Sequence, residues 1–425
     1  MSQTQKVKRL RFVTTVPPKS EVRLVHEDTE VSFVPMEAIG EDGQIQTDRT
    51  KRIGEVMNGY TYFGEGDVVM AKITPCFENG KGAIASQLVN GIGFGTTELH
   101  VLRPEKGLDS RFLFYVTKSH DFRKLGEGEM YGAGGQKRVP ESFVRDFRAF
   151  VPSMEEQHAI ADFLDRESKR LDDLILMQTR LDELLIESRK AIVASVVCHG
   201  IGPSRNLRAS GIEWLGEIPT DWKLTPVKRL FRLIVDPAPE DHGMELLSLY
   251  TDIGVRPRKE LEARGNRATT TDGYFRVRKG DFVFNKLLAW MGAIGLSEYD
   301  GVTSPAYDIL RPIVPMVDRY YDYLFRCGIC LTEFRRHSRG IMDMRLRLYF
   351  DKLGPLLMPQ PSLEEQAKIV EHLDRETTKI DAIRLSVADC IEKLREYRSA
   401  LISAAVTGQI DVRNYHPQEA AALCQ

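Results

Sequence analysis

The hexapeptide Pro152-Ser153-Met154-Glu155-Glu156-Gln157 recurs further along the chain as Pro361-Ser362-Leu363-Glu364-Glu365-Gln366. At the same offset, Leu164-Asp165-Arg166-Glu167 aligns with Leu373-Asp374-Arg375-Glu376, and the match continues without a gap over about 50 residues. Self-similarity at a fixed offset is typical of a duplicated architecture. The sequence therefore predicts two copies of one structural unit.

Both copies of the matched segment carry apolar residues at seven-residue spacing, in two interleaved rows. Such rows form the seam of a coiled coil, and serine three positions before glutamate predicts a capped helix start at Ser153 and Ser362. We expect two long helices that pair antiparallel, with Gln178 as a polar residue in the seam; the alternative is that each helix packs only against its own globular segment. The seam residues are Leu164, Leu171, Leu174, Leu181, Leu185 and Ile192 in the first helix, and Leu373, Ile380, Ile383, Val387, Leu394 and Leu401 in the second.

Landmarks also recur in the segments that precede the helices. Val7-Lys8-Arg9-Leu10 returns as Val227-Lys228-Arg229-Leu230, and Leu102-Arg103-Pro104 returns as Leu310-Arg311-Pro312. Short β-prone stretches after Gly-Asp are followed by aromatic, helix-like runs, which indicates an α+β fold. We expect a globular segment at 1–152, a helix at 153–200, a second globular segment at 201–361, a second helix at 362–411 and a tail at 412–425.

Composition indicates a soluble protein of several domains. The chain has 425 residues, 42% hydrophobic and 28% charged, and one core rarely extends over that length. No stretch approaches the ~18 apolar residues of a membrane span, and residues 1–11 do not resemble a secretory signal. We therefore expect a cytoplasmic protein.

The net charge of −2 conceals a difference between globular segments and helices. Lys and Arg minus Asp and Glu gives +1 for 1–152 and +4 for 200–361, against −4 for 153–199 and −3 for 362–411. The positive charge lies where contact with phosphates would need it, although a pI near 6.5 argues against indiscriminate binding of polyanions.

The chain resembles the specificity subunits of type I restriction-modification systems over nearly its whole length. The resemblance depends on Pro-Ser-x-Glu-Glu-Gln, on Leu-Asp-Arg-Glu, on Trp214-Leu215-Gly216-Glu217-Ile218-Pro219 with Trp222, and on Ala404-Ala405-Val406-Thr407-Gly408-Gln409-Ile410. The first globular segment lacks the Trp-Leu-Gly-Glu-Ile-Pro opening, which leaves its N-terminal boundary open.

This resemblance implies two target recognition domains that each read half of a split site in double-stranded DNA. The helices would set the spacer between the half-sites and dock methyltransferase subunits, two of them expected, and a motor-nuclease subunit would complete the assembly. S-adenosylmethionine, ATP and Mg would then belong to those partners, and this chain would hold no cofactor or metal.

The sequence carries no strong catalytic signature. A phosphate loop of the form G-x-x-x-x-G-K-[ST] does not occur, and neither does an Asn or Asp followed by Pro-Pro and an aromatic residue. We interpret Gly91-Ile92-Gly93-Phe94-Gly95 as a glycine-rich turn rather than a cofactor loop. The six cysteines are expected to be free thiols, and the C-x-x-C of Cys327 and Cys330 to be packed on a helix rather than to bind zinc.

Two kinds of segment are candidates for DNA contact in each copy. The first is the loop just before each long helix, where glycines allow close approach and Arg, Lys and Gln can bind bases or phosphates. The alternative for both of these loops is a solvated basic turn. The second kind of segment follows the Gly-Asp strands, and the alternative for Trp290 there is a core position. The candidates are Lys72, Thr74, Asn79, Lys81, Gly134, Gly135, Gln136, Lys137 and Arg138 in the first copy, and Asn285, Lys286, Trp290, Arg336, Arg339, Arg345 and Arg347 in the second.

The favoured hypothesis is a non-catalytic DNA-recognition subunit. A scaffold with tandem interaction domains on a coiled coil, which never binds DNA, is the alternative. The bases recognised and the spacer length cannot be read from this sequence.

Overall fold

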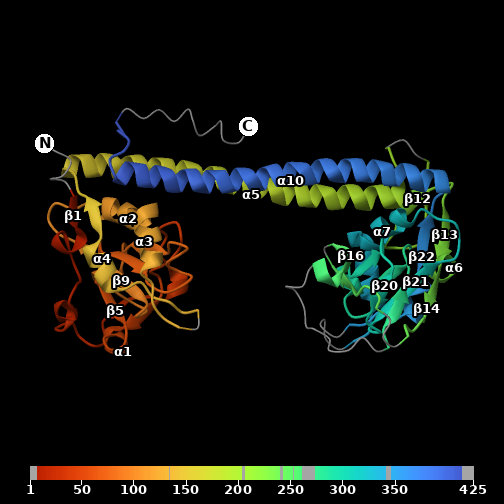
Figure 1. The fold of residues 1–425 in the computed structure, drawn as a ribbon, viewed down its shortest axis with the longest axis horizontal. Helices are drawn as coiled ribbons and strands as arrows, with labels where there is room; N and C mark the ends of the chain where they lie inside the picture. The colour runs from red at the N-terminus through yellow and green to blue at the C-terminus, as the bar shows by residue number, and fades with distance from the viewer. Residues whose placement is uncertain are drawn as a thin grey trace. The chain divides into compact units, whose positions relative to one another are not determined.

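The computed structural model describes residues 7–133, 135–202, 206–239, 243–251, 253–260, 273–340 and 346–413. The chain divides into unit 1, residues 1–180 and 387–425, and unit 2, residues 181–386. Each unit contains a globular segment and part of each of two long helices, α5 (Met154–His199) and α10 (Leu363–Val406) (Figure 1). The predicted α+β segments and long helices are confirmed.

The globular segment of unit 1 is built on sheets to which short helices are added. One sheet has the strand order β2 (Thr14–Thr15), β9 (Leu99–Pro104), β6 (Val68–Ala71), β7 (Gly82–Ile84). Another has the order β4 (Thr50–Arg52), β3 (Glu30–Val34), β8 (Ile92–Gly95), β5 (Thr61–Gly64), and β1 (Val7–Arg9) pairs with β10 (Arg148–Phe150). The α-helices are α1 (Ile53–Val56), α2 (Ser110–Lys118), α3 (His120–Gly128) and α4 (Glu141–Asp146).

Unit 2 repeats the first of these sheets with the same topology. Its strand order is β14 (Phe231–Ile234), β21 (Tyr307–Pro312), β18 (Phe282–Asn285), β19 (Ile294–Leu296). The other strand pairs are β11 (Leu207–Ala209) with β12 (Glu217–Pro219), β13 (Lys223–Pro226) with β22 (Leu357–Gln360), β15 (Leu247–Tyr250) with β16 (Gly254–Pro257), and β17 (Phe275–Val277) with β20 (Gly301–Thr303). The helices are α6 (Val227–Leu230), α7 (Asp318–Arg326), α8 (Gly328–His337) and α9 (Phe350–Leu353).

The repeated Gly-Asp and Leu-Arg-Pro motifs meet inside these matching sheets. Arg103 donates Nε and Nη2 to the Asp67 carboxylate at 2.7 and 2.8 Å, and Arg311 does the same to Asp281 at 2.7 and 2.7 Å. Both aspartates are buried, and a buried carboxylate needs a charged, hydrogen-bonded partner. The shared motifs therefore stabilise the sheet in each copy.

Each long helix begins at the predicted serine cap. The Ser153 hydroxyl accepts from the backbone N–H of Glu156 at 3.3 Å, and the Ser362 hydroxyl accepts from Glu365 at 3.2 Å. These bonds satisfy backbone donors that the first turn of a helix leaves free.

The two long helices pair antiparallel within each unit. In unit 1, Leu171 packs against Leu394, and Asp172 forms an ion pair with Arg398. In unit 2, Asp182 pairs with Arg384 at 2.7 Å, and Arg189 pairs with Asp381 at 3.3 Å. Residue numbers therefore increase along α5 where they decrease along α10, which defines an antiparallel pair. The alternative of helices packed separately is thereby excluded.

The pairing has the symmetry of the sequence repeat. The offset that aligns Ser153 with Ser362 converts the pair Asp172–Arg398 into Asp381–Arg189, and both pairs are present. The ion pair of unit 1 therefore recurs in unit 2 at the positions that the sequence repeat makes equivalent.

Only part of the predicted seam is buried. Leu164, Leu171, Leu373, Ile380, Val387, Leu394 and Leu401 are buried, whereas Leu174, Gln178, Leu185 and Ile192 are half-buried. Leu181 and Ile383, which we expect at the coiled-coil or partner interface, are 39% and 47% exposed. A straight helix drifts by about 20° per heptad relative to a seven-residue row, and the charged pair Asp182–Arg384 occupies the interhelical position beside them.

The interpretation of residues 91–95 as a turn is wrong. Residues 92–95 form β8, which lies between β3 and β5. A Cβ at Gly93 would lie 2.2 Å from Phe63 Cε2, so this glycine makes room for an aromatic ring of the neighbouring strand.

The C-x-x-C pair is buried in the core of unit 2. Cys76, Cys198, Cys327 and Cys330 are free thiols, and Cys330 Sγ lies 3.8 Å from Met358 Sδ. Cys390 is disulfide-bonded, so the expectation of a free thiol is wrong for this residue. Within the described ranges no group of three or more His, Cys, Asp or Glu residues is arranged to hold a metal ion. Cys424 lies outside the described residues.

Among the described helices, none combines the length and apolarity needed to cross a bilayer.

Candidate nucleic-acid interface

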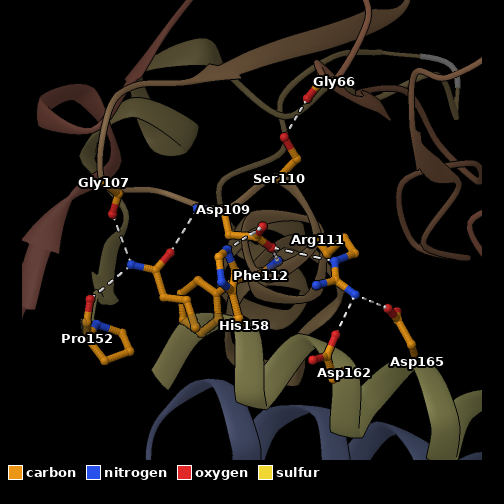
Figure 2. A network of polar contacts seen from close by, with 11 residues as sticks. Gly66, Gly107, Asp109, Ser110, Arg111, Phe112, Pro152, His158, Asp162 and Asp165 are labelled. Carbon is orange, nitrogen blue, oxygen red and sulfur yellow. Dashed lines mark hydrogen bonds and ion pairs between the residues drawn. The ribbon is translucent and has the colours of Figure 1, made fainter. Parts of the chain in front are cut away.

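A joint at the start of α5 fixes the globular segment of unit 1 to its helix. The buried Gln157 side chain donates Nε2 to the carbonyls of Gly107 and Pro152, at 2.9 Å each, and its Oε1 accepts from Asp109 N–H at 2.8 Å. Figure 2 shows these carbonyls and Asp109 converging from the loop before α2 and from the residues before α5. The last residue of the hexapeptide is therefore a structural connector.

The first joint is reinforced one and two turns further along α5. Arg111 donates to Asp162 and Asp165 at 2.7 and 2.9 Å (Figure 2), and the Tyr115 hydroxyl donates to Asp165 at 2.8 Å. Burial, together with the Asp165 carboxylate, raises the pKa of Tyr115. The aspartate of the Leu-Asp-Arg-Glu motif thus binds two side chains of α2 and holds α2 against α5.

Unit 2 reproduces this joint with its own copy of each motif. Gln366 accepts from Val317 N–H at 2.8 Å and donates to Pro361 O at 2.9 Å. Asp374 accepts from Arg319 at 2.9 Å and from the Tyr323 hydroxyl at 2.6 Å. Each globular segment is held on its own part of the helix pair by equivalent bonds.

In unit 1 the predicted loop closes on itself and on the end of β6. Arg138 and Tyr131 exchange backbone hydrogen bonds of 2.8 and 3.2 Å. Thr74 Oγ1 donates to Gly135 O at 2.7 Å and accepts from Lys137 N–H at 3.0 Å. Gly135, Gln136 and Lys137 are exposed at the tip, while Gly134 lies outside the described residues.

In unit 2 the matching loop is closed in the same way. Arg339 and Arg347 exchange backbone hydrogen bonds of 2.9 and 2.9 Å, and both are exposed. Arg345 lies outside the described residues.

The two kinds of candidate segment come together in both copies through one equivalent bond. Val139 N–H donates to Lys72 O at 2.8 Å in unit 1, and Leu348 N–H donates to Lys286 O at 2.9 Å in unit 2. The lysine after each Gly-Asp strand therefore lies at the base of the loop that precedes each long helix. These bonds bring the backbones of the two candidate segments together in each unit, and both lysines are half-buried there. We call the joined segments the loop site of each unit.

The cations of the two sites are partnered differently. In unit 1, Arg138 donates Nε and Nη2 to Glu98, at 2.9 Å each, and these bonds hold the pKa of Glu98 below its usual range. In unit 2, Lys286 donates to Asp308 at 3.1 Å, and Arg347 donates to the Tyr349 hydroxyl at 3.3 Å.

Some candidates have structural roles instead. Asn285 is 7% exposed, and its Oδ1 accepts from Leu287 N–H at 3.0 Å, so the expectation of a direct DNA contact is wrong because β18 is buried. Trp290 donates Nε1 to Leu287 O at 3.1 Å and packs against the core of unit 2, as its alternative interpretation proposed.

Three further candidates have protein partners. Asn79 donates to Glu41 at 2.9 Å, and Lys81 lies 3.4 Å from Met36 O. Arg336, at the end of α8, donates to Glu213 at 2.9 Å.

Sequence reasoning missed Glu98, Asp308 and the exposed Tyr131. Glu98 and Asp308 lie at or next to the strand that pairs with the Gly-Asp strand, β9 or β21, so register would have placed them near the lysines. Tyr131 is 64% exposed at the base of the loop, where an aromatic ring is suited to stacking on a base.

The comparisons with known proteins agree with this architecture. Residues 27–184 match the model of the type I restriction modification DNA specificity domain. The chain is 43% identical over 158 residues to the EcoEI specificity subunit and 44% identical over 154 residues to the EcoAI specificity subunit, both type I restriction enzyme subunits of Escherichia coli. Each match covers 36% of this chain and 26% of the relative, so the chain matches about a quarter of those relatives' length.

Solved structures share the fold over nearly the whole chain. One comes from a study of complex assembly and conformational transition of the type I R-M system, with a TM-score of 0.71, 17% identity and coverage of 95% of this chain and 98% of that one. The HsdS subunit of Thermoanaerobacter tengcongensis gives a TM-score of 0.57 at 17% identity, covering 95% and 97%.

Fold and comparisons define a protein with a duplicated α+β segment joined to an antiparallel helix pair. Residues 27–184 match the type I restriction modification DNA specificity domain, and the chain is similar in that part to type I restriction enzyme specificity subunits.

Proposed function

We propose that this chain is the DNA sequence-specificity subunit of a type I restriction-modification enzyme. Each unit reads one half of a bipartite site through its loop site. The observation that supports this most directly is the repeated bond from Val139 to Lys72 and from Leu348 to Lys286, which presents a cationic loop in the same way in both copies. Two similar surfaces with different side chains are suited to two different half-sites.

The chain acts in this proposal without chemistry of its own. Methyltransferase subunits, two of them, dock on the helices and bring S-adenosylmethionine, and a motor-nuclease subunit brings ATP and Mg. The half-exposed apolar residues of the helices, such as Leu181 and Ile383, support the docking of further helices there.

The test is to produce the chain with its methyltransferase subunits in a cell that lacks other adenine methylation, and to sequence the modified adenines. We expect a bipartite motif with an unspecified spacer. An assembled complex that methylates adenines without any shared motif would contradict the proposal and favour the scaffold alternative.

A second experiment addresses the spacer. Inserting four residues into each long helix adds about 6 Å to a continuous helix, which is roughly two base pairs of DNA. We expect a longer spacer and unchanged half-sites, whereas an unchanged spacer would reject the role of the helices in setting it.

A further inference from the structure

The ion pair between Glu98 and Arg138 distinguishes the loop site of unit 1 from that of unit 2. Glu98 lies just before β9, and Arg138 closes the loop before α4, so the pair joins two segments that are 40 residues apart. The side chains of Arg138 and Glu98 are 38% and 26% exposed, so solvent reaches both. A surface pair of this kind contributes little to stability, so stability alone does not account for it.

The geometry of the pair determines which donors of Arg138 are still available. A guanidinium has five N–H donors in a planar fork. Glu98 takes the edge formed by Nε and Nη2, with both bonds at 2.9 Å. The outer edge, formed by Nη1 and the second hydrogen of Nη2, has no hydrogen-bond partner within the part of the chain that the structure describes.

The backbone of Arg138 is fixed as well. Its N–H donates to Tyr131 O at 2.8 Å, its carbonyl accepts from Tyr131 N–H at 3.2 Å, and it forms a β-bridge with Ile73. Both ends of a long side chain are therefore held before any DNA arrives. Preorganisation of this kind reduces the entropy lost on binding and penalises a base that does not fit.

We propose that the outer edge of Arg138 reads a guanine in the half-site of unit 1, and that Glu98 is the positioning residue that holds this edge toward the DNA. Two parallel N–H groups match O6 and N7 of guanine in the major groove, whereas adenine places an amino donor at the position of O6. The inference rests on the proposed function. It adds guanine as the base that is read, and Glu98 as the residue that positions Arg138 to read it.

Glu98 also sets the charge of the site. Lys72 contributes to lowering the pKa of Glu98, so the carboxylate faces two cations. Because Glu98 remains ionised, the pair has no net charge and attracts phosphates weakly. Arg138 then contributes more to choosing a base than to general affinity.

The test uses the assembled methyltransferase complex and its own motif, with every single-base change in the half-site of unit 1. We expect Arg138→Ala to remove discrimination at one G·C pair, by roughly tenfold or more. Glu98→Gln keeps the size of the side chain but loses its charge and one of the two bonds, so discrimination at that same pair should fall several-fold. Glu98→Asp keeps the charge and should lie between wild type and Glu98→Gln.

A matched control separates positioning from general stability. Glu37→Gln removes a carboxylate from another exposed pair of unit 1, with Arg49 at 3.3 Å, and should leave both half-sites unchanged. The half-site of unit 2 and the melting temperature should stay at wild-type values in all variants.

Three outcomes would overturn the inference. They are an Arg138→Ala effect at an A·T pair, unchanged discrimination in Glu98→Gln, and an equal loss at every position of the half-site in Glu98→Gln. Absence of any bipartite motif in the wild-type complex would instead refute the proposed function, so the two failures are distinguishable.

Discussion

At the joint with the long helices, units 1 and 2 use the same residue types in the same bonds, with Gln157 matched by Gln366 and Asp165 by Asp374. At the loop sites they differ, because Arg138 is paired with a carboxylate and its counterpart Arg347 donates to a tyrosine hydroxyl. The sequence motifs that recur are those that hold the globular segments in place. The loop arginine is present in both copies, and what differs between them is its hydrogen-bond partner.

The largest loss of stability is expected at the joint between the globular segment of unit 1 and α5. Gln157→Met would leave the carbonyls of Gly107 and Pro152 and the N–H of Asp109 without their partner. Buried groups left unsatisfied each cost about 1–3 kcal/mol, so we expect unit 1 to lose about 3 kcal/mol of stability in denaturant unfolding.

The matched variant Gln366→Met should destabilise unit 2 somewhat less, because Gln366 has two such bonds within the described residues where Gln157 has three. Gln46→Met, at an exposed position of unit 1, should change little. If the Gln157 and Gln46 variants unfolded alike, the joint would not have the structural role assigned to it.

The second-largest effect is expected at the interhelical ion pairs, where loss of Arg398 and loss of Arg189 should cost different amounts of stability. Arg398 is 23% exposed and bonded to both Asp172 and Asp42, whereas Arg189 is 38% exposed and paired with Asp381. We expect Arg398→Met to cost about 2 kcal/mol, because it leaves a partly buried carboxylate unpaired. Arg189→Met should cost about 0.5 kcal/mol. Equal costs in thermal unfolding would show that the two ends of the helix pair are equally dependent on their ion pairs.

The same variant predicts a pH dependence. Burial already raises the pKa of Asp172, and loss of Arg398 removes the main influence that lowers it. A carboxyl group whose folded pKa lies above its unfolded value costs stability as pH rises through that range. The deficit of Arg398→Met relative to wild type should therefore shrink as pH falls toward the unfolded pKa of Asp, and a deficit that grew on acidification would contradict this assignment.

Substitution of Arg347 should affect DNA binding differently from substitution of Arg138. Arg347 is exposed and, within the described residues, is paired with no carboxylate. We expect Arg347→Ala to weaken binding by about 1 kcal/mol at all variants of its half-site, as loss of a phosphate contact does. A loss confined to one base pair, measured by equilibrium binding of the complex, would assign base reading to Arg347 too.

The smallest effect is expected at the strand-end lysine of unit 2. Asp308 neutralises Lys286 at 3.1 Å, so Asp308→Asn should free one cation at the base of the loop. The slope of log affinity against log salt should then steepen by about one unit. An unchanged slope would mean that Lys286 does not reach a phosphate.

The repeated elements were predictable from sequence for a physical reason. Helix caps and heptad rows are local patterns, so Ser153, Ser362 and most seam positions could be placed without tertiary information. The loops before the long helices could be proposed as sites because glycine and cations cluster there. What could not be predicted was the partner of each cation, because the pairing of Arg138 with Glu98 depends on strand register.

Burial inside the sheets was equally beyond local patterns. The sequence pattern puts Asn285 just after a strand, where an exposed residue is expected, but Asn285 is the last residue of β18 and all four residues of this strand are buried. Residues 92–95 contain glycines typical of turns, but those glycines accommodate Phe63 and Leu99 in a strand. In both cases the neighbouring side chain, not the local sequence, determines the structure.

The most direct test of the account replaces the globular segment of unit 2, residues 230–359, with that of unit 1, residues 10–150, and sequences the adenines that the assembled complex modifies. Because the joints use matching residues and the same ion pair recurs in the helix pair of each unit, we expect an inverted repeat of the half-site of unit 1 with the original spacer. A motif that retains the half-site of unit 2 would contradict it.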